Sequence, residues 1–288
     1  MANGYTALCP SSLSSTLTSA PPRLDLESEL SADPTLMPVY YSKSGVPSIF
    51  LQPPDYIQTK SHFVKEGDEK LCVASAIYSP SDISLIYAKD FPKKVDSFAW
   101  HMTDVYNAVM KSAHRVKWIV NSNLVQDGMF LAVFRREDKE WLRGKVLNPT
   151  STNQTEKRFM VEYIDFGDHA EVSEQDLAYL HKNFAHKLGW AIKCRLELDL
   201  YFDQYHKGEV MWKRSLNHHL HETLFDKRFR VKFIKKVIQF GEEVWEVSLL
   251  KFRDDHPMNA VQQPIQKQII LQSFDAYVKE GGAEVTKF

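Results

Sequence analysis

Apolar and polar residues alternate along residues 128–172 in a way that predicts several short strands. The apolar runs cover 129–134, 141–147, 159–164 and 170–172, and charged or polar turns separate them. A tight turn at 165–168 joins the last two runs. Four or five short antiparallel strands in about 45 residues are too few for an open sandwich, so the pattern predicts a small bent barrel whose rim gathers side chains from several turns.

The flanking segments predict further strands and helices. Before the barrel, 71–77 and 83–88 form a predicted hairpin, and a helix with apolar residues at spacings of three and four covers 95–109. After it, Ser173 is predicted to cap a helical turn over 173–180. The remaining predictions are a strand at 191–200, a helix at 208–225, a hairpin of 228–237 with 243–252, and a final helix at 265–278.

Composition sets the domain boundaries that we expect. Residues 1–45 are rich in Ser, Pro, Thr and Ala and predict a flexible leader, and 46–69 predict a linker with a short apolar anchor at 48–51. One module is expected over 70–254, followed by a C-terminal helix or tail over 255–288. With 43% hydrophobic and 12% aromatic residues in 288, the chain can form a substantial core.

Charge and cysteine content narrow the class of protein. A net charge of -1 argues against a generally basic protein that coats nucleic acid. Three widely spaced cysteines, Cys9, Cys72 and Cys194, indicate a reducing compartment without a disulfide framework. The sequence shows no secretory signal, and its longest apolar runs are far shorter than the roughly 20 residues of a membrane helix, so we expect no membrane partner.

Three separated motifs resemble the core of a Tudor domain. They are Ala132-x-Phe134, Glu140-Trp141-x-Arg143 and Tyr163-Ile164-Asp165-Phe166-Gly167-Asp168. The hairpin at 77–83 and the strand at 191–196 extend the resemblance to the extended Tudor module of Tudor-family proteins in the PIWI and piRNA pathway. The resemblance implies a mainly β fold with helices, in which a Tudor (SH3-like) barrel over 121–186 is inserted into a staphylococcal-nuclease-like OB-type domain formed by 70–120 and 187–254.

The resemblance also implies a pocket for an arginine side chain. Aromatic faces attract a guanidinium or methylated guanidinium. The family's cage positions map onto Phe134, Leu142, Tyr163, Phe166 and Asp168. Leu142 replaces an aromatic residue and Asp168 a neutral amide, which leads to the hypothesis that unmethylated arginine is tolerated or preferred. The alternative is that Phe134 and Phe166 fill the barrel, that Trp141 packs, and that Asp165 and Asp168 bond within the turn.

Two charged segments suggest how a partner is attracted. Six carboxylates and no Lys or Arg lie between 162 and 176, which predicts a negative edge that attracts an arginine-rich tail, with an ordinary solvated face as the alternative. A basic row over 227–236 alternates with Phe229, Val231 and Phe233. Because these apolar residues point toward the core, the row lacks stacking platforms, and single-stranded RNA binding is the alternative function.

No motif indicates an enzyme. His218, His219 and His221 lie close together but lack the spacing and partner ligands of a metal site, and no nucleophile or phosphate-loop motif is present. We therefore expect no catalytic residue, no metal and no cofactor. By resemblance, the expected function is a scaffold that binds arginine, unmethylated or symmetrically dimethylated, in the N-terminal tail of a PIWI-class Argonaute in cytoplasmic, perinuclear nuage-type granules. The sequence leaves self-association open.

Overall fold

The protein is mainly β. The computed structural model describes residues 46–149, 157–197, 214–239 and 241–250. The strands are β1 (Glu69–Ser79), β2 (Asp82–Tyr87), β3 (Phe130–Arg135), β4 (Glu140–Pro149), β5 (Arg158–Tyr163), β6 (His169–Ser173), β7 (Leu177–Tyr179), β8 (Ile192–Leu196), β9 (Arg228–Gln239) and β10 (Glu242–Leu250). The α-helices are α2 (Lys93–Lys111), α3 (Lys182–Ala185) and α5 (Arg214–Leu224), and short 3-10 segments are Lys60–Phe63, Ala113–Lys117, Ser122–Leu124 and Glu174–Asp176.

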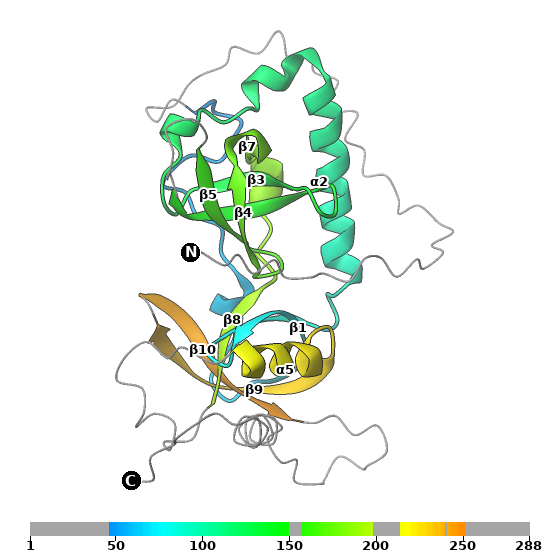
Figure 1. Cartoon of the computed structure of the whole chain (residues 1–288), viewed down its shortest axis with the longest axis vertical. Coiled ribbons are helices and arrows are strands. Elements are labelled where there is room, and N and C mark those ends of the chain that lie inside the picture. The colour runs from blue at the N-terminus through cyan, green and yellow to red at the C-terminus, as the bar shows by residue number, and fades with distance from the viewer. Residues whose placement is uncertain (1–45, 150–156, 198–213, 240, 251–288) are drawn as a thin grey trace, which may run out of the picture.

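The outer domain is a closed barrel with the strand order β1-β2-β8-β10-β9. β8 and β10 are parallel and the other neighbours are antiparallel. Alternation along β9 directs Val231 and Phe233 into the core, where both are fully buried. α5 packs against the barrel through Leu220 and Leu224, which are also fully buried (Figure 1). The predicted hairpins and the predicted helix-strand order of this domain are confirmed.

The inner domain lies between β2 and β8 in the chain and is a five-stranded antiparallel sheet with the order β6-β5-β4-β3-β7. Figure 1 shows this sheet at one end of the molecule, the outer barrel at the other, and α2 running alongside the inner sheet. The expected insertion of one β domain into another is therefore confirmed. It follows that the ends of β2 and β8 that face the inner domain fix how the inner sheet meets the outer barrel.

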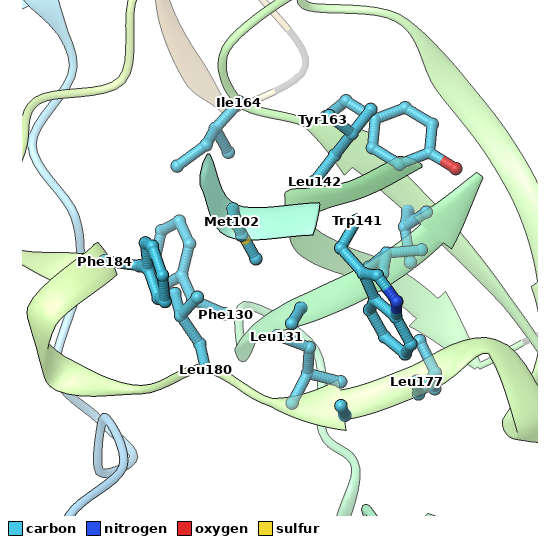
Figure 2. Packing of buried hydrophobic residues seen from close by; sticks show 14 of the residues in the cluster. Met102, Phe130, Leu131, Trp141, Leu142, Tyr163, Ile164, Leu177, Leu180 and Phe184 are labelled. Carbon is cyan, nitrogen blue, oxygen red and sulfur yellow. The ribbon is translucent and has the colours of Figure 1, made fainter. Parts of the chain in front are cut away.

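Helix α2 is packed on β4 through aromatic rings and polar bonds. Tyr106 is fully buried and stacks on Trp141 with ring centroids 5.1 Å apart. The Trp141 main-chain N–H donates to Thr103 Oγ1 (2.8 Å), and its indole N–H donates to Asn107 Oδ1 (3.2 Å). Figure 2 shows part of the apolar cluster to which Met102 of this helix belongs, together with Trp141 and Leu142 of β4. Trp141 is therefore a packing residue, as predicted.

The segment around Phe50 packs closely against the inner domain. Phe50 is fully buried and lies against Trp118 and Tyr179, with ring centroids 5.1 and 5.4 Å away. The Leu51 N–H donates to the Leu180 carbonyl (2.8 Å), and the Lys182 N–H donates to the Ile49 carbonyl (3.2 Å). The apolar residues at 48–51 thus lie along the folded body.

The predicted helical turn over 173–180 is wrong in its second half. Residues 174–176 form a 3-10 turn, but Leu177–Tyr179 is strand β7, paired with β3. Ser173 precedes the turn without capping it, because its hydroxyl donates to Asp176 Oδ2 (3.1 Å). Leu177–Tyr179 form the edge strand of the sheet, and the stabilisation from pairing with β3 and from burial outweighs the local helical pattern. The predicted leader, the start of the 208–225 helix and the 265–278 helix lie outside the described residues.

Candidate functional site

The turn between β5 and β6 is the structural centre of the candidate site. Phe166 N and Gly167 N donate to the Tyr163 carbonyl (3.1 and 2.6 Å), and Tyr163 N donates to the Asp168 carbonyl (2.8 Å). Gly167 has φ +83°, and a Cβ there would lie 2.0 Å from Ser84 Oγ. Only glycine therefore fits both the left-handed backbone and the close approach of the outer barrel.

The outer barrel holds this turn from its other side. Ser75 Oγ donates to the Phe166 carbonyl (2.6 Å), and Ser84 Oγ donates to the Gly167 carbonyl (3.4 Å). The Tyr78 ring stacks on His169 with centroids 5.1 Å apart, and its hydroxyl accepts from the His169 main-chain N–H (2.6 Å). Strands β1 and β2 thus fix the main chain that carries Phe166 and Asp168.

Arg143 of β4 forms a sealed ion pair with the first residue of the turn. Its side chain is 0% exposed, and it bonds both oxygens of Asp165, with Nε to Oδ2 at 2.9 Å and Nη2 to Oδ1 at 2.5 Å. The remaining donors reach the carbonyls of Phe184, Lys187 and Leu188 at 3.0, 2.5 and 3.0 Å. All five N–H groups of the guanidinium are therefore satisfied.

Aromatic rings complete the surroundings of Arg143. The guanidinium lies 4.7 Å from the centroid of Phe98 and 5.5 Å from that of Trp190. The prediction that Asp165 bonds within its own turn is wrong, because its carboxylate is committed to Arg143 on another strand. The motif in the sequence contains Arg143 but does not show its role, which depends on a partner 22 residues away.

A second arginine, Arg135 at the end of β3, occupies the predicted pocket. Its guanidinium carbon lies 5.5 Å from the Tyr163 ring centroid and 5.2 Å from that of Phe166. Arg135 Nη1 donates to Asp168 Oδ2 (3.3 Å). The Arg135 and Asp168 side chains are 11% and 13% exposed, so a small part of each reaches the surface. We call Arg135, Tyr163, Phe166 and Asp168 the arginine pocket.

Three of the five predicted site residues meet in the arginine pocket: Tyr163, Phe166 and Asp168. Leu142 is buried on the same face of the sheet, since it lies two residues from Gly144, the partner of Tyr163 in the β4–β5 register. Phe134 points to the opposite face, where its ring lies 5.3 Å from that of Trp141, which is labelled in Figure 2.

Arg135 was missed by the sequence reasoning, although strand register contains the signal. Val133 pairs with Leu142 and Arg135 with Glu140, so Val133, Arg135 and Leu142 share one face. Phe134 lies between them on the other face. The hairpin register, rather than the motif alone, identifies which residue of β3 faces Tyr163.

The arginine pocket contains one acidic group, Asp168, whose ionisation depends on burial and on Arg135. Burial raises the pKa of the Asp168 carboxyl above its ordinary value, and Arg135 opposes this shift only in part. Asp168 Oδ1 is buried and has no hydrogen-bond partner among the described residues. Burial, followed by the nearby Asp168 charge, also raises the pKa of Tyr163, which keeps its ring neutral. The pocket therefore combines two neutral aromatic faces with a carboxylate that has an unused acceptor.

The predicted negative edge over 162–176 is wrong as an open surface. Five of its carboxylates are paired with cations from other segments. The pairs are Glu162 with Lys193, Asp165 with Arg143, Asp168 with Arg135, Glu171 with Arg158 and Asp176 with Arg136. Cations from other segments thus neutralise most of the negative charge that clusters along the sequence, and little of this charge remains to attract a distant cation.

The basic row of β9 is partly neutralised in the same way. Arg230, Lys235 and Lys236 pair with Glu69, Glu246 and Glu243, and Phe229 and Phe233 are buried as predicted. Because they are buried, Phe229 and Phe233 offer no stacking platform for RNA bases. In the described part of the chain, no group of three or more His, Cys, Asp or Glu is arranged to hold a metal, and no helix is long and apolar enough to cross a membrane.

Comparison with known proteins identifies the inner domain and its surroundings. Residues 64–198 match the Tudor domain family model. A Tudor and KH domain-containing protein homolog of Drosophila melanogaster is 25% identical over 158 residues, which is 54% of this chain and 26% of the relative. The chain thus spans about a quarter of that relative's length.

Solved extended Tudor domains share the fold. The third extended Tudor domain of mouse TDRD1, in complex with a MILI peptide containing dimethylarginine, has a TM-score of 0.57 and 14% identity over 76% of this chain and 96% of that one. An Asp-to-Ala variant of the Drosophila melanogaster Papi extended Tudor domain, in complex with an unmethylated Piwi N-terminal peptide, has a TM-score of 0.55 and 20% identity over 72% of this chain and 98% of that one. At these identities the likeness establishes the fold.

Proposed function

Starting from a chain that contains a Tudor domain with the extended Tudor fold, we propose that this protein is a non-catalytic scaffold that binds a peptide arginine. The arginine belongs to the N-terminal tail of a PIWI-class Argonaute in piRNA-mediated silencing. The observation that carries the proposal is that Tyr163, Phe166 and Asp168 already hold a guanidinium, that of Arg135. These groups are therefore chemically suited to a peptide arginine.

The Asp168 carboxylate, as the hydrogen-bond acceptor of the pocket, determines which methylation state of arginine is preferred. Methylation removes N–H donors, whereas an unmodified guanidinium keeps all five. Asp168 is ionisable and buried, and its Oδ1 has no hydrogen-bond partner among the described residues. Leu142, which stands where the family has an aromatic residue, is buried on the same face of the sheet and adds no aromatic face. We infer a preference for unmethylated arginine, with symmetrically dimethylated arginine as the weaker ligand.

The position of the pocket supports recognition of an extended peptide. The turn that carries Phe166 is bonded to Ser75 and Ser84 of the outer barrel, so residues next to a bound arginine lie beside both domains. One enclosed side chain gives modest affinity, and flanking contacts add to it. Such a module brings small-RNA factors together in cytoplasmic, perinuclear nuage-type granules. Structural neighbours solved with Piwi and MILI peptides support the peptide-binding part of this proposal.

Peptide titration tests the proposal. An Arg-Gly peptide is titrated calorimetrically into the full chain in unmodified and symmetrically dimethylated forms. We expect saturable binding that is tighter for the unmodified form and that falls about tenfold or more in Phe166→Ala, which removes an aromatic face. Phe134→Ala is the matched control, because Phe134 packs on the opposite face.

The two phenylalanine variants and the two peptide forms test separately whether the pocket binds arginine and which methylation state it prefers. Equal loss in both phenylalanine variants would mean that the affinity depends on general folding rather than on the pocket. A tighter dimethylated form would overturn the inferred preference while leaving arginine recognition intact. Failure of both peptides to bind would overturn the function itself.

A further inference from the structure

We propose that Arg135 is a specificity-determining residue that acts as a built-in competitor for the arginine pocket. This inference rests on the proposed function and deepens it. The Arg135 guanidinium lies over Tyr163 and Phe166 and bonds Asp168, the three side chains that a peptide arginine needs. Two guanidinium groups cannot stack on the same rings at once, so a peptide arginine binds only in exchange for Arg135.

Strand register brings Arg135 into the pocket. Arg135 is the last residue of β3 and pairs with Glu140, which places it on the same face as Leu142. Tyr163 pairs with Gly144 on that face. The sheet thus directs the Arg135 side chain across β4 toward β5, and its long stem lets the charged group reach the two rings.

The contacts of Arg135 make the exchange feasible. The bond to Asp168 is 3.3 Å long, at the weak end of the range, and one Asp168 oxygen is still open. Arg135 Nε also lies 2.5 Å from Asp138, and Nη2 lies 3.7 Å from Glu140. Both carboxylates belong to the β3–β4 hairpin and are partly exposed. Arg135 therefore keeps acidic neighbours when its head leaves the rings.

The competitor lowers the apparent affinity of the pocket for every arginine ligand. When only a fraction of the molecules present an open site, the apparent dissociation constant rises by the inverse of that fraction. Arg135 thus sets a threshold: a peptide is retained only if its flanking contacts offset the cost of displacing the resident side chain. A single arginine on an unrelated protein lacks these flanking contacts, so it does not offset the cost of displacing Arg135.

Replacing Arg135 by alanine tests the proposal directly. We expect Arg135→Ala to bind the unmodified Arg-Gly peptide on the order of tenfold more tightly than the native chain, because the site is always open. Arg136→Ala is the matched control. It removes the same charge from the next residue, whose guanidinium pairs with Asp176 instead of Asp168. We expect its affinity to stay within about twofold of the native value, since exposed charges contribute little.

A second measurement separates this inference from the function it rests on. The side-chain Nε–Hε resonance of Arg135 is followed by nuclear magnetic resonance in the full chain, assigned by its loss in Arg135→Ala. In the free protein we expect a ring-shifted resonance that moves toward the solvent-exposed value as peptide saturates.

Two outcomes would overturn the proposal that Arg135 competes with peptide and would leave the proposed peptide-binding function standing. They are peptide binding with an unchanged Arg135 resonance, and an equal affinity of Arg135→Ala and the native chain. Absence of binding by both chains would overturn the function, and an unshifted Arg135 resonance in the free protein would refute its place on the rings.

Discussion

Two arginines of neighbouring strands meet two aspartates of the same turn, and they do so in opposite ways. Arg143 is 0% exposed, and all five of its donors are bonded, to Asp165 and to three carbonyls. Arg135 is 11% exposed and reaches Asp168 at 3.3 Å. Both stack on two aromatic rings. The fully buried Arg143–Asp165 pair thus stabilises the fold, whereas the partly exposed Arg135–Asp168 pair can take part in recognition.

The largest effect is expected from removing the sealed arginine. Arg143→Ala leaves Asp165 buried without its partner, and we expect a loss of about 3 to 5 kcal/mol in the free energy of unfolding. Arg135→Ala is the matched variant on the open side, and we expect a loss below about 1 kcal/mol, because Asp168 can take up a proton. Urea unfolding of both variants measures the difference. Equal losses would remove the distinction between the two pairs.

The next effect concerns the glycine between the two aspartates. Gly167→Ala forces a Cβ into Ser84 at a left-handed position, and we expect a loss of about 2 to 4 kcal/mol. Gly128→Ala is the control, since Gly128 has φ +79° and an added Cβ would meet no atom within 4 Å. Its expected cost is about 1 to 2 kcal/mol, from backbone strain alone. If thermal unfolding gave the two variants the same stability, contact with the outer barrel would not matter to the turn.

A charged cluster between the inner sheet and the outer barrel should make the fold sensitive to acid. Glu242 of the outer barrel is half-buried; burial alone raises its pKa, but hydrogen bonds from Lys145 and Lys193 bring the pKa down to about 2. Because the folded pKa is lowered from the ordinary 4.5, this stabilisation is present above pH 4.5 and is lost as pH falls toward 2. Lys193 also pairs with Glu162, the residue before Tyr163.

Glu242→Gln should therefore remove a pH-dependent part of the stability. We expect it to be about 1 to 2 kcal/mol less stable than the native chain at pH 7, after allowing for solvent screening, and nearly equal at about pH 2. Urea unfolding at several pH values measures this. Glu243→Gln, on an exposed neighbour, is the control and should change the pH profile less. A constant difference across pH would show that Glu242 acts through packing rather than charge.

The smallest effect is expected at the open aspartate. Burial raises the pKa of Asp168, so its ionised form is disfavoured in the folded chain, and stability is lost as pH rises through the folded pKa. Asp168→Asn avoids this cost, and we expect a change between zero and a gain of about 1 kcal/mol at pH 7. Asp165→Asn, which weakens the sealed pair, should instead destabilise the chain. Chemical unfolding at pH 7 compares them, and a large loss in Asp168→Asn would place it with the sealed pair.

Most strands were predictable because each shows its own apolar alternation. β9 is an example, since Phe229, Val231 and Phe233 alternate with charges and are buried in the structure. β7 was not predictable, because three apolar residues acquire strand geometry only by pairing with β3. The pairing of barrel strands across the inserted domain came from family resemblance rather than from periodicity.

The candidate site was only partly predictable for the same reason. Tyr163, Phe166 and Asp168 lie within one short turn, so a local motif locates all three. Arg135 and Arg143 act through partners 33 and 22 residues away, and no local pattern records these distances. The choice of Phe134 over Arg135 depended on one step of strand register, which reverses the face of a side chain.

The closed outer barrel has a consequence for how the chain is made. Its first hairpin, β1 and β2, emerges from the ribosome before the whole inner domain, while β8, β9 and β10 come last. During synthesis β1 and β2 therefore wait with open hydrogen-bonding edges, which is the state most prone to pairing with other chains. We expect nascent protein to depend on chaperones until the final strands arrive.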